Sequence, residues 1–369
     1  MEEIRRKICN LTYVRNVSVI LGRKCNGRCV YCAQSGLSVI EDKPFNPDVI
    51  EFVSKLTQFN RKDKNDRLQI LFYGGEPLLY FSYIKAIIEG VVNSAETVQG
   101  TYYFKMFTNG SLLTEEMVSF FNKYNVKIIL GYDGPDENTR PIRLKNEQIP
   151  LFLKLNHKAV SFVLSSKNSS IVRCASYIRK KFGKDISIDN LAFCSYYNGD
   201  VSIYGYCLND FETFYSNFLL FFSYYENHPV DDLFWHLVRG MFRTNSLMGE
   251  KLDFLSVDIS GNLFGFADKE DSFICTIYED GIDKILKYRL NVHSKQCYTC
   301  IYNYCCRAYY GIKNEDSVDY NCKMVKSYVK ALECFRWRII SILGRPENQK
   351  YLESLSSTWK ISLVNRLSL

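Results

Sequence analysis

Three cysteines near the start of the chain have the type and spacing to bind a metal centre. Cys25, Cys29 and Cys32 are separated by three and then two residues, directly after an apolar run. Thiolates are the usual protein ligands of iron-sulfur clusters. A [4Fe-4S] cube has four irons, so three cysteines would leave one iron with open positions for a small molecule. A zinc site, which would need a fourth ligand in the same loop, and three buried thiols without metal are the alternatives.

A second set of cysteines lies towards the end of the chain. Its members are spaced as Cys297-x2-Cys300-x5-Cys306 and are followed by Cys322. Four thiolates can enclose a cluster completely, which suits electron transfer or a structural role. The same four residues could also hold zinc. The chain has 14 cysteines in all, and their clustering favours metal binding over disulfides.

The elements that must position these residues follow an alternating pattern up to about residue 193. Short apolar or β-branched runs alternate with longer segments of helical spacing. The predicted strands are 17–21, 68–72, 102–107, 127–130, 159–164 and 186–193. The predicted helices are 48–60, 80–94, 114–124 and 171–182. Such a succession predicts parallel strands with right-handed crossovers. Six units are too few for a complete eight-stranded barrel, so the expected fold is α/β, a partial (β/α)6 TIM barrel.

Short polar motifs follow these predicted strands. The motifs are the first cysteine loop, Gly74-Gly75-Glu76-Pro77, Thr108-Asn109-Gly110 and Asp133-Gly134-Pro135. The carboxyl ends of parallel strands gather catalytic loops at one edge of a sheet. We therefore expect all four motifs to meet there. Turn chemistry alone would also explain the last two.

The first cysteine motif, with the aromatic Tyr31 before its last cysteine, resembles the signature of radical S-adenosylmethionine (SAM) enzymes. The glycine-rich motif resembles the loop of the same family that holds the methionine amino group, and this implies cofactor-binding roles for Gly74, Gly75, Glu76 and Pro77. The resemblance implies that SAM chelates the fourth iron of the cluster. One electron then cleaves SAM, and the resulting 5'-deoxyadenosyl radical abstracts a hydrogen atom from the substrate.

Two further loops resemble cofactor-binding parts of that family. Thr108 and Asn109 resemble the loop on the ribose side, and Asp133 with Arg143 resembles the motif after the fourth strand. The chain departs from the pattern at two places. A serine that often precedes the aspartate by two residues is replaced by Gly131, and the usual His-Asp pair is replaced by Thr139-Arg140. The first change implies that a hydroxyl contact to the cofactor is lost.

The carboxyl-terminal cysteines resemble a partial SPASM extension, which is found on radical enzymes that modify ribosomal peptides and on anaerobic sulfatase-maturating enzymes. Asp258-x2-Gly261-x2-Phe264 resembles its opening hairpin. Phe266 and Tyr310 stand where the complete form has further cluster cysteines. The resemblance therefore implies one auxiliary [4Fe-4S] cluster in place of two. Its expected ligands are Cys297, Cys300, Cys306 and Cys322.

Another cysteine could act in catalysis. Cys194 ends the sixth predicted strand and could face the reaction chamber as a hydrogen-atom donor. The more ordinary interpretation is a small buried side chain.

The sequence predicts four regions. Residues 1–210 form the radical SAM barrel, 211–251 a helical linker, 252–334 the SPASM-like domain and 335–369 a helical tail. No room is expected for a fused leader-binding domain, so leader recognition would use the barrel edge, the last helices or a separate protein.

The expected function is a peptide maturase that installs a crosslink or a related modification in a ribosomally synthesised precursor peptide. A flavodoxin or ferredoxin-type reductant would supply electrons. The alternatives are a sulfatase-type maturase that forms formylglycine, a peptide epimerase and a non-catalytic iron-sulfur electron carrier. An aspartate follows the cysteine at the Phe266 position in the sulfatase-type enzymes, whereas Ala267 follows here and Asp268 comes one place later.

Composition and charge exclude several other classes. The formal charge of +7 is modest for 369 residues, and opposite charges are interspersed, so no nucleic-acid partner is expected. The first residues contain no apolar region typical of a signal peptide. The longest apolar run, 218–225, is too short to cross a bilayer. A cytoplasmic location without membrane contact is therefore predicted.

Overall fold

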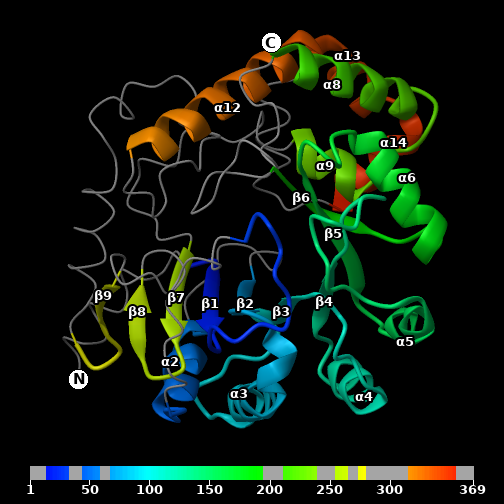
Figure 1. Ribbon diagram of the computed structural model, residues 1–369. Helices are drawn as coiled ribbons and strands as arrows, with labels where there is room; N and C mark the ends of the chain where they lie inside the picture. Colours follow the sequence, from blue (N-terminus) through cyan, green and yellow to red (C-terminus); the bar gives the residue numbers. More distant parts are fainter. Residues whose placement is uncertain are drawn as a thin grey trace.

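A computed structural model describes residues 14–32, 44–58, 67–193, 211–238, 254–264, 273–279 and 315–354. In this part of the chain nine strands form one sheet, in the order β6-β5-β4-β3-β2-β1-β7-β8-β9 (Figure 1). The first six strands are parallel to their neighbours and follow one another across the sheet in sequence order. This arrangement is the partial barrel of six βα units that the sequence predicts.

The bounds of the six strands agree with the predicted ranges to within two residues. The strands are β1 (Asn16–Ile20), β2 (Leu68–Tyr73), β3 (Tyr102–Thr108), β4 (Lys127–Gly131), β5 (Lys158–Leu164) and β6 (Ile188–Phe193). The helices between them are α2 (Asp48–Leu56), α3 (Phe81–Asn93), α4 (Glu115–Lys123), α5 (Ile149–Leu153) and α6 (Ile171–Phe182), with the 3-10 turns η2 (Pro77–Tyr80) and η3 (Asn146–Gln148). The short helix α5 was not predicted.

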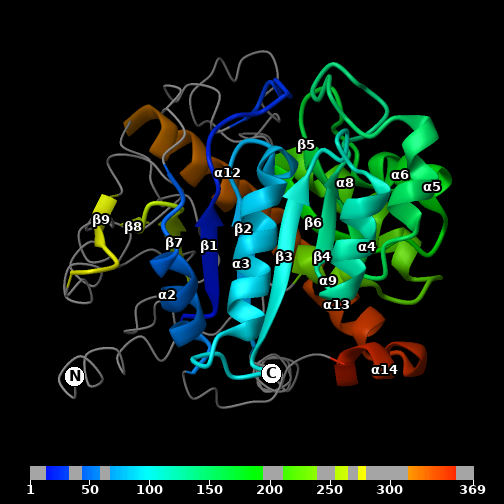
Figure 2. The same ribbon diagram turned by 90° about the horizontal axis from the view of Figure 1, so that it is seen from below.

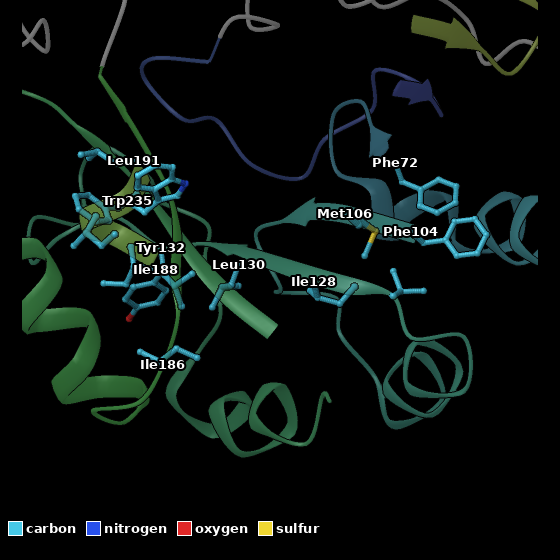
Figure 3. Packing of buried hydrophobic residues seen from close by; sticks show 14 of the residues in the cluster. Phe72, Phe104, Met106, Ile128, Leu130, Tyr132, Ile186, Ile188, Leu191 and Trp235 are labelled. Atoms are coloured by element: carbon cyan, nitrogen blue, oxygen red, sulfur yellow. The ribbon is translucent and has the colours of Figure 1, made fainter. Parts of the chain in front are cut away.

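The two faces of the sheet differ in character because successive side chains of a strand point to opposite faces. One face is apolar and is covered by helices, among them α3 and α4 (Figure 2). Met106, Ile128 and Leu130 are fully buried on that side (Figure 3). The other face carries polar groups. There Lys105 and Lys127 both pair with Asp189, at 3.0 and 3.2 Å.

The sheet extends beyond β1 through residues that the sequence assigns to a separate domain. Strand β7 (Phe254–Asp258) pairs in parallel with β1, and β8 (Asn262–Phe264) and β9 (Phe273–Thr276) continue the sheet in antiparallel pairing. Asp258 holds the β7–β8 turn, since its Oδ1 accepts hydrogen bonds from the backbone of Ser260 and Asn262, both at 2.9 Å. The expected hairpin is therefore present. The division of the chain into four regions stays a prediction.

Helices at one end of the molecule form an aromatic layer. They are α8 (Phe211–Tyr225), α9 (Asp232–Val238), α12 (Glu315–Cys334), α13 (Arg336–Leu343) and α14 (Pro346–Ser354). Figure 1 shows α8 and α12 lying against each other. The ring of Tyr328 on α12 meets Phe214 and Phe218 on α8 edge to face. Within the described ranges no helix has the length and apolar character to cross a membrane.

Candidate cofactor and metal site

The cysteine loop leaves β1 at the carboxyl edge of the parallel strands. The backbone N–H of Leu21 donates to the carbonyl of Tyr73 at 2.9 Å, which continues the pairing of β1 with β2 into the loop. Cys29 and Cys32 are joined by a turn in which the N–H of Cys32 donates to the carbonyl of Cys29 at 3.0 Å. Cys25 is exposed and the other two cysteines are partly buried. None of the three forms a disulfide.

Burial raises the pKa of two of these thiols. The pKa of Cys29 is raised to about 11 by burial, against the opposing effect of Arg140. Burial also raises the pKa of Cys25, although the N–H of Gly27 donates to its Sγ at 3.2 Å and acts in the other direction. Metal ligation requires thiolates, so metal loading of this loop must release protons.

The Gly-Gly-Glu-Pro motif after β2 packs directly on the backbone of the cysteine loop. The N–H of Gly75 donates to the carbonyl of Gly22, and the N–H of Glu76 donates to that of Lys24, both at 2.9 Å. A β-carbon on Gly75 would lie 2.1 Å from the carbonyl oxygen of Lys24. One on Gly74 would lie 2.3 Å from the Gly22 oxygen. Glycines are required here because the two loops touch at their backbones.

Glu76 connects the loops that follow β2 and β3. Its buried carboxylate accepts hydrogen bonds from Thr108 Oγ1 at 2.6 Å, from the N–H of Asn109 at 2.8 Å and from the N–H of Leu78 at 3.1 Å. Burial raises the pKa of Glu76, and these hydrogen bonds oppose the rise. The last bond also caps η2, which begins at Pro77. Both carboxylate oxygens thus have protein donors.

A polar network ties the third-strand loop to the cysteine loop. The side-chain amide of Asn109 donates to Asn26 Oδ1 at 2.9 Å, and Asn26 in turn donates to Ser111 Oγ at 2.9 Å. Ser111 closes the triangle by donating to Asn109 Oδ1 at 2.6 Å. The predicted meeting of these loops at one edge of the sheet is therefore what the structure shows.

Asp133 occupies the corresponding position after β4 and is buried. Tyr31 of the cysteine loop donates its hydroxyl hydrogen bond to Asp133 Oδ2. The N–H of Val163 donates to the other oxygen at 3.1 Å. Thr139 Oγ1 lies 3.4 Å from Oδ2. Asp133 therefore holds the aromatic residue of the cysteine loop in place, a contact that the sequence did not predict.

Arg140 is a site residue that the motif comparison noted only as a departure. Its Nε lies 3.5 Å from Asp133 Oδ2, and its Cζ is 5.7 Å from the ring centroid of Tyr31. The backbone beside it is joined to the cysteine loop, because the N–H of Val30 donates to the carbonyl of Thr139 at 3.2 Å. Burial opposes its charge, but Tyr31 and Asp133 outweigh this and raise the pKa of Arg140, which stays cationic.

Arg143, the predicted cofactor ligand, lies against Tyr132 and away from the cysteine loop. Its Cζ is 4.7 Å from the ring centroid of Tyr132, and its guanidinium pairs with Glu137. Tyr132 points to the helix-covered face, where its ring meets Tyr177 and Phe182. The structure therefore brings Arg140 to the cysteine loop and places Arg143 against the other face of the strand end.

Comparisons with known proteins agree with this geometry. Residues 19–158 match the Radical SAM superfamily. The chain carries a radical SAM domain. The match begins inside β1 and extends past β4 with all the loops described above, so the prediction of a radical SAM domain built on a partial barrel is confirmed.

One relative of the radical SAM domain is named as a cyclopropyl synthase. Over 218 residues the chain is 23% identical to the radical SAM cyclopropyl synthase TigE of Paramaledivibacter caminithermalis. The aligned part is 56% of this chain but only 44% of that relative, so the chain spans less than half of its length.

Solved structures share the fold over more of the chain. Native anSMEcpe with bound AdoMet has a TM-score of 0.66 at 17% identity, covering 89% of this chain and 98% of that one. SuiB of Streptococcus suis bound to its precursor peptide SuiA has a TM-score of 0.56 at 14% identity, covering 83% and 75%. At these identities the likeness shows the fold alone.

The three thiols of the cysteine loop form a donor set of the kind that binds an iron-sulfur cluster. Among the described residues, no three His, Cys, Asp or Glu side chains converge on a point that would hold one metal ion. A cube makes a different demand, since each thiolate binds its own iron. The thiols of Cys25, Cys29 and Cys32 are close enough to interact electrostatically with one another. The superfamily implies a [4Fe-4S] cluster and SAM, and these three thiols would hold the cluster.

Other predicted site residues lie outside the described residues. They are Cys194, Cys297, Cys300 and Cys306, together with the substituted positions Phe266 and Tyr310. Cys322 is described, and it lies partly buried in α12.

Proposed function

We propose that this chain is a radical SAM peptide maturase that modifies a ribosomally synthesised precursor peptide. The single observation that carries the proposal is the joining of the Cys25–Cys32 loop to the Gly-Gly-Glu-Pro loop by backbone hydrogen bonds at the carboxyl edge of the sheet. When bound, the cluster and SAM supply reductive cleavage of the sulfonium and a 5'-deoxyadenosyl radical that abstracts hydrogen from the substrate.

The chain's own residues would position that chemistry. The three cysteines would hold the cluster on a loop whose path is set by backbone hydrogen bonds from Gly75 and Glu76. Glu76 keeps the loops after β2 and β3 in a fixed relation through Thr108 and Asn109. Rigid placement matters because a radical must meet one hydrogen atom of the substrate and no solvent.

A peptide is the substrate class that the comparisons favour. SuiB was solved with its precursor peptide SuiA, and anSMEcpe with the Kp18Cys peptide. The relative named as a cyclopropyl synthase favours formation of a carbon–carbon bond over simple oxidation. A sheet that is open at one side can admit an extended peptide. A flavodoxin or ferredoxin-type protein would supply the electrons, and a separate protein could present the leader.

We also propose one auxiliary cluster, held by Cys297, Cys300, Cys306 and Cys322. Four thiolates leave no open iron, so this cluster would accept or relay the electron left on the substrate. If Cys297 and Cys300 are both replaced by Ala, SAM cleavage should persist in part while the modified peptide is lost. Unchanged product formation would contradict the electron-transfer role.

Anaerobic reconstitution tests the whole proposal. The protein is loaded with iron and sulfide, reduced with dithionite and incubated with SAM and the peptide encoded beside its gene. We expect 5'-deoxyadenosine, a peptide of altered mass and about eight irons per chain, which is two clusters of four. Absence of 5'-deoxyadenosine with the peptide present would refute the catalytic claim. About four irons would refute the auxiliary cluster only.

A further inference from the structure

We propose that Arg140 binds the carboxylate of SAM in this chain, in place of Arg143. The inference rests on the proposed function, because it names a residue of the same cofactor site. It concerns the positioning of the cofactor and leaves open which peptide is modified.

Strand geometry places the two arginines on opposite sides of the end of β4. Gly131 and Asp133 share one face of the strand end, and Tyr132 between them faces the helices. The side chain of Arg140 lies on the face of Gly131 and Asp133, since its guanidinium lies over Gly131 and beside Asp133. The side chain of Arg143 lies on the opposite, helix-covered face, against the ring of Tyr132.

Arg140 also lies beside the cysteines. The carbonyl of Thr139 accepts a hydrogen bond from Val30, between Cys29 and Cys32. The cationic charge of Arg140 acts on both Cys29 and Cys25. A ligand that chelates a cluster held by these cysteines would therefore meet this guanidinium.

One nitrogen of the Arg140 guanidinium, Nε, meets its only described acceptor at an ion-pair distance and not within hydrogen-bond geometry. The Arg140 side chain is only 15% exposed, and its Nε is buried without a hydrogen-bond partner among the described residues. Asp133 is the neighbouring carboxylate, and its oxygens already accept from Tyr31 and Val163. A buried guanidinium is costly unless anions satisfy its donors, and Asp133 satisfies Nε only at 3.5 Å. A second carboxylate, presented side-on, matches the planar fork of arginine.

The two departures from the family pattern are thereby explained together. A β-carbon at position 131 would come within 2.8 Å of Arg140 Nη1. A serine at position 131 and an arginine at position 140 compete for the same space. The guanidinium of Arg140 would therefore replace, as a hydrogen-bond donor to the cofactor, the serine hydroxyl that is missing at position 131.

The test measures SAM binding without turnover. Reconstituted, unreduced protein is analysed by equilibrium dialysis against SAM and against decarboxylated SAM, which lacks only the carboxylate. The variants are Arg140→Gln, Arg140→Lys and Arg143→Gln. Iron content and the visible absorbance of the cluster confirm that each variant is loaded. If Arg140→Gln cannot be loaded with the iron-sulfur cluster, Arg140→Lys is used in its place. Lysine keeps the positive charge and loses only the planar pair of N–H donors.

We expect Arg140→Gln to weaken SAM binding by about 10- to 100-fold, the loss typical of a charge-assisted hydrogen bond, with Arg140→Lys in between. Binding of decarboxylated SAM should change by less than about twofold, because the group that Arg140 recognises is absent. In the reduced protein, the change in the electron paramagnetic resonance spectrum on adding SAM should be reduced in Arg140→Gln.

Three results would overturn the inference. Equal weakening of both ligands would show that Arg140 only supports the loop. Unchanged SAM binding in Arg140→Gln would show that another residue binds the SAM carboxylate. A comparable loss of SAM affinity in Arg143→Gln would also contradict the assignment to Arg140. Failure of the unaltered protein to bind SAM at all is a different outcome, since it would refute the proposed function itself.

Discussion

The guanidinium of Arg140 lies against the backbone of Gly131, at a distance that leaves no room for a side chain on residue 131. The neighbouring atoms are the far end of a flexible side chain, at 2.8–3.0 Å from an ideal β-carbon. The fold can therefore accept a small side chain at position 131 only by moving Arg140.

The first prediction follows from that contact. Gly131→Ala should displace Arg140 and weaken SAM binding by about tenfold, with little change in melting temperature. Equilibrium dialysis and thermal unfolding measure the two effects separately. In an Arg140→Gln background the same Gly131→Ala change should have no further effect on binding, and an undiminished effect there would contradict the steric explanation.

The second prediction concerns the contact between the Gly-Gly-Glu-Pro loop and the cysteine loop. Gly75→Ala places a β-carbon 2.1 Å from the backbone oxygen of Lys24, which cannot move as a side chain can. The two loops must separate, so the iron content after reconstitution should fall by more than half. Gly344→Ala is the matched control, because its nearest atom is 3.3 Å away and it lies far from the loops in sequence. Normal iron content in Gly75→Ala would show that the loops are not held together.

The third prediction concerns Glu76 as a connector. Glu76→Gln keeps the shape but turns an amide N–H₂ towards backbone or hydroxyl donors, and should destabilise the fold by about 2 kcal/mol. Thr108→Val removes one of the donors. The double variant should lose less stability than the sum of the single ones, as expected for groups in contact. Additive losses in the apparent free energy of unfolding would mean that the 2.6 Å hydrogen bond contributes nothing.

The fourth prediction is a pH dependence at the polar face of the sheet. Burial would raise the pKa of Asp189, but Lys105 and Lys127 outweigh it and lower the pKa below the usual 3.8. The stabilisation is therefore complete at neutral pH and is lost as the pH falls below 3.8 through the lower pKa of the folded state.

Melting temperatures across this range check the prediction. Asp189→Asn should be less stable than the unaltered protein at pH 7, and the difference should narrow below pH 4. The exposed Asp185 provides the control, because Asp185→Asn should change stability little at any of these pH values. A difference that stays constant down to pH 3 would show that the ion pairs with the two lysines do not stabilise the fold.

Local patterns in the sequence were enough to predict the six parallel strands and four of the five helices between them. Strands such as 102–107 and helices such as 171–182 were predicted almost to the residue, because apolar periodicity and flanking turns are read over a few neighbours. The motif after β2 was likewise predictable, since Gly74 to Pro77 follows a strand directly. The pairing of β7 with β1 could not be predicted from the sequence. Phe254 and Asn16 are paired although they lie far apart in the chain, and no local pattern encodes such a pairing.

The sequence by itself determined which chemistry is available. Cys25, Cys29 and Cys32 at their spacing, on a loop after a buried strand, predict a three-thiolate site from local sequence alone. Only the tertiary structure decided which arginine accompanies it. Arg140 and Arg143 are three residues apart and equally basic, and the choice between them depends on the face of β4 that each meets. Arg140 occupies the space above Gly131, and Arg143 packs on the ring of Tyr132. These contacts form only when β4 is packed in the folded sheet.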